Sequence, residues 1–112
     1  MSVAQDITSA RSHFQAILAG VFLALAACAA AAAGDPKAGE IKALACQVCH
    51  GPKGVSTNPL YPILAGQHAE YLERQLRHFR DKSRIDAVMN EMTQKLTDKD
   101  IQDLASYFAN AK

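Results

Sequence analysis

The feature that most constrains this chain is the run Cys46-Gln47-Val48-Cys49-His50, which follows the pattern C-x-x-C-H. This pattern is typical of c-type haem attachment. Two thiols three positions apart on one helical turn can add across the two vinyl groups of a haem, and the adjacent histidine can then ligate the iron. The sequence therefore predicts one covalently bound haem c, with Cys46 and Cys49 as attachment points and His50 as a metal ligand.

Three other uses of the two cysteines fit the sequence less well. A redox-active disulfide motif usually follows a strand in a βαβ unit, and no strand is predicted before Cys46. A structural zinc site needs four ligands, and beyond the motif only His68 and His78 remain. A disulfide between Cys46 and Cys49 would close too short a loop to constrain the unfolded chain. Haem is therefore the leading interpretation.

The first 33 residues have the organisation of a secretory signal. Arg11 and His13 precede an apolar run over 14–27, and small residues follow it. We therefore expect a signal peptide over 1–33 and a mature domain over 34–112. Two alternatives stay open: Leu25-Ala26-Ala27-Cys28 resembles a lipobox, which would tether the protein to a membrane through Cys28, and 14–33 is just long enough to be an uncleaved anchor.

The mature segment, about 80 residues, is small enough that its core needs a filler such as haem. Its apolar spacing predicts an all-α domain with three main helices and long loops. The first helix begins at the N-cap Asp35 and runs over 37–48, with one side formed by Ala38, Ile41, Ala45 and Val48. Gly39 inside this helix predicts close approach by another helix, with the aromatic end of the third helix as its partner.

Glycines and prolines between 51 and 66 predict a loop. The second helix is expected over 67–82, with a buried stripe of Ala69, Leu72, Leu76 and Phe79 and a basic edge of Arg77, Arg80 and Arg84. The third helix is expected to begin after the N-cap Thr97 and to bury Ile101, Leu104, Ala105 and Phe108.

A haem iron has a second axial position, and four side chains are candidates for it: Met89, Met92, His68 and His78. The two methionines lie in a polar linker between the second and third helices, for which no periodic structure is predicted. Methionines in such a linker have little core to fill, so a methionine ligand is favoured over the two histidines or an open site.

Beyond the C-x-x-C-H motif, several further segments occur in a characteristic order. They are Gly34-Asp35-Pro36-Lys37-Ala38-Gly39, Tyr61-Pro62-Ile63-Leu64-Ala65-Gly66-Gln67, the Met89-x-x-Met92 pair, Leu96-Thr97-Asp98-x-Asp100-Ile101 and Tyr107-Phe108. With these segments the chain resembles the small class I cytochromes c of bacterial respiratory chains, in particular the single-haem c553 proteins and each half of the dihaem cytochrome c4 family. It departs from cytochrome c4 in carrying one such domain.

The resemblance implies a class I cytochrome c fold, in which Met89 is the axial ligand and Met92 packs nearby. It also implies that the Pro62 carbonyl accepts the Nδ1–H of His50, a bond that fixes the ring.

A haem iron with His and Met ligands changes its charge by one electron without changing its coordination. We therefore expect an exported, periplasmic electron carrier that is not an enzyme, with a quinol–cytochrome c reductase and a terminal oxidase or other periplasmic oxidoreductase as partners. Net charge +1 gives no indication of nucleic-acid binding. A membrane is expected to be involved only if Cys28 is lipidated or the signal is uncleaved. The alternatives are a haem subunit of a larger periplasmic redox complex and a haem-based ligand sensor.

Overall fold

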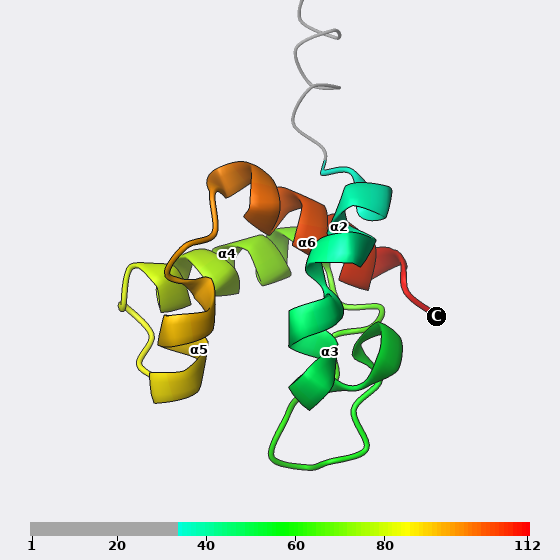
Figure 1. The fold of residues 1–112 in the computed structure, drawn as a ribbon, viewed down its shortest axis with the longest axis horizontal. Coiled ribbons are helices and arrows are strands. Elements are labelled where there is room, and N and C mark those ends of the chain that lie inside the picture. Colours follow the sequence, from blue (N-terminus) through cyan, green and yellow to red (C-terminus); the bar gives the residue numbers. More distant parts are fainter. Residues whose placement is uncertain (1–33) are drawn as a thin grey trace, which may run out of the picture. The chain divides into compact units, whose positions relative to one another are not determined.

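The structure is a computed structural model that describes residues 34–112. All regular elements in this part are helical: α2 (Pro36–Lys42), α3 (Leu44–His50), the 3₁₀ turn η1 (Pro52–Gly54), α4 (Ala69–Arg80), α5 (Ala87–Thr93) and α6 (Asp98–Asn110) (Figure 1). The all-α prediction is confirmed. The expected signal peptide over 1–33, with its lipobox cysteine Cys28, lies outside the described residues. Within 34–112, no helix combines the length and apolar character needed to cross a bilayer.

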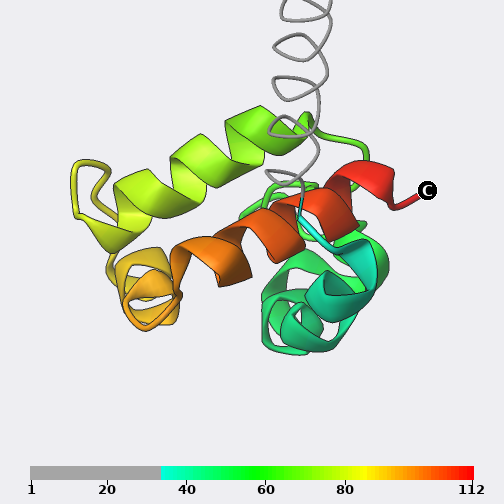
Figure 2. The ribbon, with the colours of Figure 1, turned by 90° about the horizontal axis from the view of Figure 1, so that it is seen from above.

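Helix α6 is the centre of the domain and packs against both α2 and α4 (Figure 2). Its start is fixed as expected, because Thr97 and Asp100 form a reciprocal capping box. The predicted stripe is also confirmed, since α6 supplies most of the buried apolar side chains. These are Ile101, Leu104, Ala105 and Phe108, joined by Leu72 and Phe79 of α4 and by Ala43 between α2 and α3.

The close approach predicted at Gly39 lies between α2 and α6. A Cβ atom at Gly39 would overlap the backbone carbonyl of Asp103 and would lie 2.7 Å from the Cβ of Tyr107. The contact therefore involves the middle of α6 as well as its aromatic end. Glycine at position 39 allows the two helix backbones to touch.

A buried carboxylate, absent from the sequence-based expectations, sits at the same contact. Asp103 is 1% exposed. It accepts hydrogen bonds from Lys42 Nζ at 2.7 Å, Lys99 Nζ at 2.6 Å and the backbone N–H of Asp35 at 2.8 Å. Burial raises the pKa of Asp103, but these three donors outweigh that effect and hold it below its usual range. Asp103 thereby ties the start of the domain to α6.

The first predicted helix differs from the observed one in two respects. It is interrupted at Ala43 into α2 and α3, and it extends to His50. The side formed by Ile41 and Val48 faces solvent, with these residues 74% and 83% exposed. The inward face is instead lined by smaller residues, among them Gly39 and Ala43, because only small residues permit the close contact with α6.

The second predicted helix is confirmed as α4, with each end two residues inside the expected range. Leu72 and Phe79 are buried, and Ala69 and Leu76 pack against the same core. The linker that follows has no strong periodicity in its sequence, yet it contains a further helix that the sequence did not predict. Residues 87–93 form α5, because Asp86 caps the segment by accepting a hydrogen bond from Met89 N–H.

Candidate functional site

Helix α3 carries the whole C-x-x-C-H motif, which runs from the third residue of the helix, Cys46, to its last residue, His50. Cys46 and Cys49 are half-buried free thiols. Burial raises the pKa of the Cys46 thiol, so this group is protonated and neutral at neutral pH. Two unpaired thiols on one helical turn beside a histidine are the arrangement that thioether attachment of a haem requires.

His50 is the most buried member of the motif, with 7% of its surface exposed. Its Nδ1 atom lies 2.8 Å from the Pro62 carbonyl oxygen. Because a carbonyl only accepts hydrogen bonds, Nδ1 carries the proton and Nε2 keeps its lone pair. The Tyr61 ring packs edge-on against the imidazole, with centroids 6.2 Å apart. These contacts fix the ring and leave Nε2 as the nitrogen that can ligate a metal.

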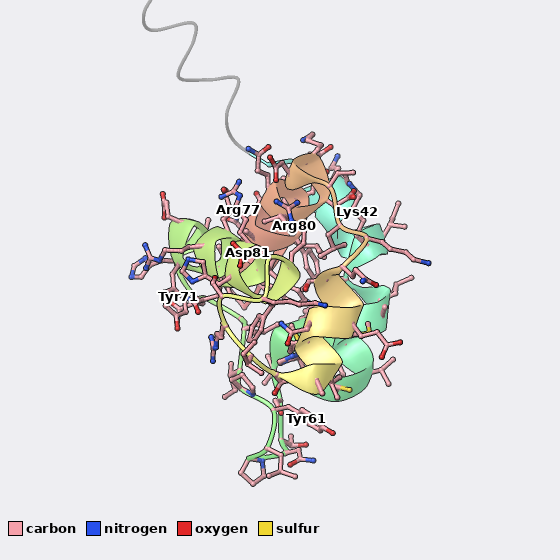
Figure 3. All side chains as sticks on the ribbon, turned by 90° about the vertical axis from the view of Figure 1, so that its left-hand side faces the viewer. Lys42, Tyr61, Tyr71, Arg77, Arg80 and Asp81 are labelled. Carbon is pink, nitrogen blue, oxygen red and sulfur yellow. The ribbon has the colours of Figure 1, made fainter. Side chains whose placement is uncertain are left out.

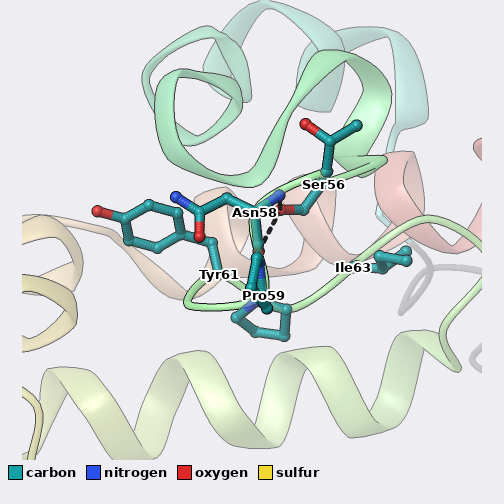
Figure 4. Close-up of a pocket in the computed structure, with 7 residues that line it drawn as sticks. Ser56, Asn58, Pro59, Tyr61 and Ile63 are labelled. Atoms are coloured by element: carbon teal, nitrogen blue, oxygen red, sulfur yellow. Dashed lines mark hydrogen bonds between the residues drawn. The ribbon is translucent and has the colours of Figure 1, made fainter.

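The loop that supplies the Pro62 carbonyl is held at both ends by backbone hydrogen bonds. The Gly54 carbonyl accepts from Leu64 N–H at 2.8 Å and from Ala65 N–H at 3.1 Å, and Gly66 N–H donates to the Phe108 carbonyl at 2.9 Å. Between these anchors the loop encloses a small open hollow lined by Ser56, Thr57, Asn58, Pro59, Tyr61, Pro62 and Ile63 (Figure 4). The hollow therefore lies within the loop whose Pro62 carbonyl orients the His50 ring.

The two methionines lie on α5. Met89 is half-buried, and its N–H donates to the Asp86 carboxylate at 2.9 Å. Met92 is 46% exposed, and its packing near the haem, which the resemblance implies, stays a prediction. α5 packs on α4, whereas α3 packs on α2 and η1, and Figures 1 and 2 both show α3 and α5 apart from one another. His50 and Met89 are therefore carried by separate parts of the fold.

The two remaining histidines both belong to α4. His68 is its exposed N-cap residue, and His78 lies half-buried in its last turn. Within 34–112, no three His, Cys, Asp or Glu side chains gather in a group that could hold a metal ion. The zinc interpretation finds no support in this part of the chain, since a structural zinc site needs four such ligands.

The side chains of this domain fit a large apolar group. Several sizeable apolar residues of the 55–63 loop and of the α5 region are exposed: Val55, Leu60, Ile63, Ile85, Val88 and Met92. The buried apolar core of the described residues is small for a domain of this length. A haem fits this donor set, because its attachment needs two thiols, its iron takes an imidazole nitrogen and a thioether, and its macrocycle adds apolar volume.

The basic edge expected on α4 is largely neutralised by neighbouring groups. Arg80 donates to Asp98 at 2.6 Å and to the Leu96 carbonyl at 2.9 Å, and Arg77 contacts Glu73 at 3.2 Å (Figure 3). Arg84 lies over the Phe79 ring, 4.5 Å from its centroid. These arginines stabilise the junctions of α4 with the neighbouring segments.

Comparison with known proteins agrees with this donor set. The family model for cytochrome c matches residues 37–112. Cytochrome c4 of Thiocapsa roseopersicina is 49% identical over 82 residues, covering 72% of this chain and 42% of that protein. The chain thus spans less than half of that relative. Cytochrome c-554(548) of Halomonas halodenitrificans is 44% identical over 81 residues, covering 70% of this chain and 98% of that protein.

Among solved structures, the thiosulfate dehydrogenase of Marichromatium purpuratum is similar with a TM-score of 0.67 and 32% identity, covering 70% of this chain and 20% of that one. The family match spans nearly all of the described residues, and the fold and the paired thiols agree with it. The chain therefore belongs to the cytochrome c family and carries covalently bound haem c.

Proposed function

We propose that the chain is an exported one-electron carrier of a bacterial respiratory chain. Its single haem c is attached through Cys46 and Cys49 and ligated by His50 and Met89. The observation that carries the proposal is the buried His50 ring, which is held through Nδ1 by the Pro62 carbonyl at the end of the helix that presents both thiols. This arrangement is suited to keeping one iron ligand fixed while the iron changes its charge.

When bound, haem supplies an iron that accepts and releases one electron. The hydrogen bond from Nδ1 to the Pro62 carbonyl orients the His50 ring and raises the basicity of Nε2. A thioether from Met89 favours the reduced iron and raises the reduction potential. This role does not require any residue to make or break a bond in a substrate, so the proposed role is transport of electrons and not catalysis.

The partners of such a carrier are redox proteins that dock transiently through a small interface. We propose a quinol–cytochrome c reductase as electron donor, and a terminal oxidase or another periplasmic oxidoreductase as acceptor. The proposed location is the periplasm, with membrane attachment only if Cys28 is lipidated or the signal is uncleaved.

A second candidate is a haem subunit of a larger periplasmic redox complex. The similarity to part of a thiosulfate dehydrogenase favours it. The two roles differ in the state of the isolated protein, because a complex subunit is recovered at stoichiometric ratio with its enzyme and a carrier is recovered alone. Gentle purification from the native periplasm, followed by mass measurement of the intact assembly, separates them.

The proposal is tested on the full chain, expressed together with a c-type haem maturation system. Acidified organic solvent should leave haem on the protein, and Cys46→Ala or Cys49→Ala should weaken or abolish its attachment. A redox titration should follow a single reversible one-electron curve, and the ferrous protein should not bind carbon monoxide. Release of haem by the solvent would refute thioether attachment. Binding of carbon monoxide would refute an iron with both axial positions occupied by protein side chains and would favour the ligand sensor.

A further inference from the structure

Asn90 follows Met89 in α5, and its side chain forms hydrogen bonds with backbone groups of three other residues. Its Nδ2 donates to the Phe79 carbonyl at 2.7 Å and to the Arg84 carbonyl at 2.8 Å. Its Oδ1 accepts from the Asp86 N–H at 2.9 Å. These partners belong to the last turn of α4, to the connection between the helices and to the N-cap of α5. One amide thus joins three successive segments.

The connection between α4 and α5 is held by polar contacts. Every residue from 81 to 88 is exposed, so no buried side chain anchors this stretch. Besides the bonds to Asn90, the Arg84 N–H donates to the His78 carbonyl at 3.0 Å. The Arg84 guanidinium donates to Gln75 Oε1 at 2.7 Å and covers the Phe79 ring. The attachment of α5 to α4 at this end therefore depends mainly on polar contacts, with Asn90 at their centre.

Met89 shares this framework. Its N–H is bound by the Asp86 side chain, and the backbone N–H of Asp86 is bound by Asn90. Its carbonyl accepts from the buried Thr93 hydroxyl at 2.8 Å. Both backbone polar groups of Met89 are thus engaged by side chains, and the backbone of one of the residues that supply them, Asp86, is itself held by Asn90. Because these contacts fix the backbone of Met89, they limit how far its sulfur can move.

We propose that Asn90 is a positioning residue that holds α5 so that the Met89 thioether stays on the iron; this inference rests on the proposed ligation by Met89. Loss of the Asn90 amide frees the α4–α5 connection and lets Met89 leave the iron more often. Coupling of this kind is reciprocal, so removal of Met89 from the iron also loosens the contacts of Asn90.

The test uses the ferric holoprotein and imidazole, which competes with Met89 for the iron. The association constant measured for imidazole rises when Met89 dissociates from the iron more easily. Asn90→Ala should raise that constant about tenfold, the effect of losing one or two net hydrogen bonds, and should weaken the long-wavelength absorption band of methionine-ligated ferric haem. Asn90→Asp, which keeps the acceptor and removes both donors, should behave like Asn90→Ala.

Two variants serve as controls. Asn110→Ala removes an asparagine whose amide bonds only to the Ser106 carbonyl within α6, and Asp35→Ala removes the N-cap of α2, which lowers stability without touching α5. Both should bind imidazole within about twofold of the wild type. If the Asn90 variants bind imidazole like the controls, the positioning role is refuted.

The two proposals fail in different ways. If Met89→Ala keeps the long-wavelength band, the ligation itself is wrong; if Met89→Ala loses it while Asn90→Ala is unchanged, only the role of Asn90 is wrong. Should neither Asn90 variant accumulate, hydrogen exchange on the wild type decides. Saturating imidazole should speed exchange of the Asp86 N–H, and unchanged protection overturns the inference.

Discussion

Replacing Gly39 by alanine tests the helix contact on which the domain is built. The new methyl group would overlap the backbone carbonyl of Asp103 and would lie 2.7 Å from both the Asp103 carbonyl carbon and the Tyr107 Cβ. These obstacles are backbone atoms or a Cβ, which cannot turn aside as the end of a flexible side chain can. Relief therefore requires α2 and α6 to move apart.

The magnitude follows from two opposing effects. Alanine gains about 1 kcal/mol over glycine in a helix interior. Overpacking costs roughly 1–3 kcal/mol where side chains can adjust, and more is expected against backbone. Separation of the helices also strains the hydrogen bonds of Asp103 to Lys42 and to the Asp35 N–H. We expect a net loss of about 2–3 kcal/mol, which lowers Tm by roughly 10–20 °C in a domain of this size.

Thermal and urea unfolding of the holoprotein, followed by far-ultraviolet circular dichroism, measures this loss. The control is Glu40→Ala, because Glu40 is the exposed neighbour of Gly39 in the same helix and its replacement should change stability by less than about 0.5 kcal/mol. A Gly39→Ala protein as stable as the wild type, or more stable, would show that the contact between α2 and α6 is not tight.

Asp103→Asn should destabilise the protein by about 2–4 kcal/mol at neutral pH, since three donors lose a buried carboxylate. The pKa of Asp103 is lowered in the folded protein, and Lys42 and Thr97 lower the pKa of Asp100 to about 2. Both carboxylates therefore stabilise the fold fully above the unfolded-state pKa of about 4, and this stabilisation decreases as the pH falls toward 2. The urea midpoint of the wild type should fall over that range and approach the midpoint of Asp103→Asn. Met92→Ala should cost the holoprotein about 2–4 kcal/mol, because haem is expected to cover the apolar side chains of α5, and an unchanged urea midpoint would contradict packing of Met92 near the haem. The mature N-terminus should lie within 29–35 by intact mass, and a diacylglyceryl group on Cys28 would instead establish a tethered carrier.

Sequence patterns predicted α4 and α6 well because both helices are long enough to show a full apolar period. The start of α6 could also be predicted, since Thr97 is a residue type favoured at the N-cap. The five site residues came from two sources: the C-x-x-C-H spacing indicated three of them, and family resemblance supplied Pro62 and Met89. The bond between His50 and the Pro62 carbonyl is present in the fold, while the role of Met89 toward iron stays a prediction.

Three features could not be predicted for physical reasons. The seven residues of α5 are too few for a periodic pattern, so its cap Asp86 was the only local signal. The apolar pattern predicted the wrong inward face for α2 and α3, because close contact with α6 requires small residues there and not large apolar ones. The buried Asp103 interrupts an otherwise apolar stripe, and its partners lie far away in the sequence, so its burial depends on tertiary structure.

The central claim is that His50 and Met89 close both axial positions of one haem. The most direct measurement compares the ferric absorption spectra of wild type, Met89→Ala and Met92→Ala, together with carbon monoxide binding to the ferrous forms. The account predicts that Met89→Ala alone loses the long-wavelength band, has a lower reduction potential and binds carbon monoxide. Loss of the band in Met92→Ala alone would move the ligand by three residues, and its retention in both variants would contradict methionine ligation.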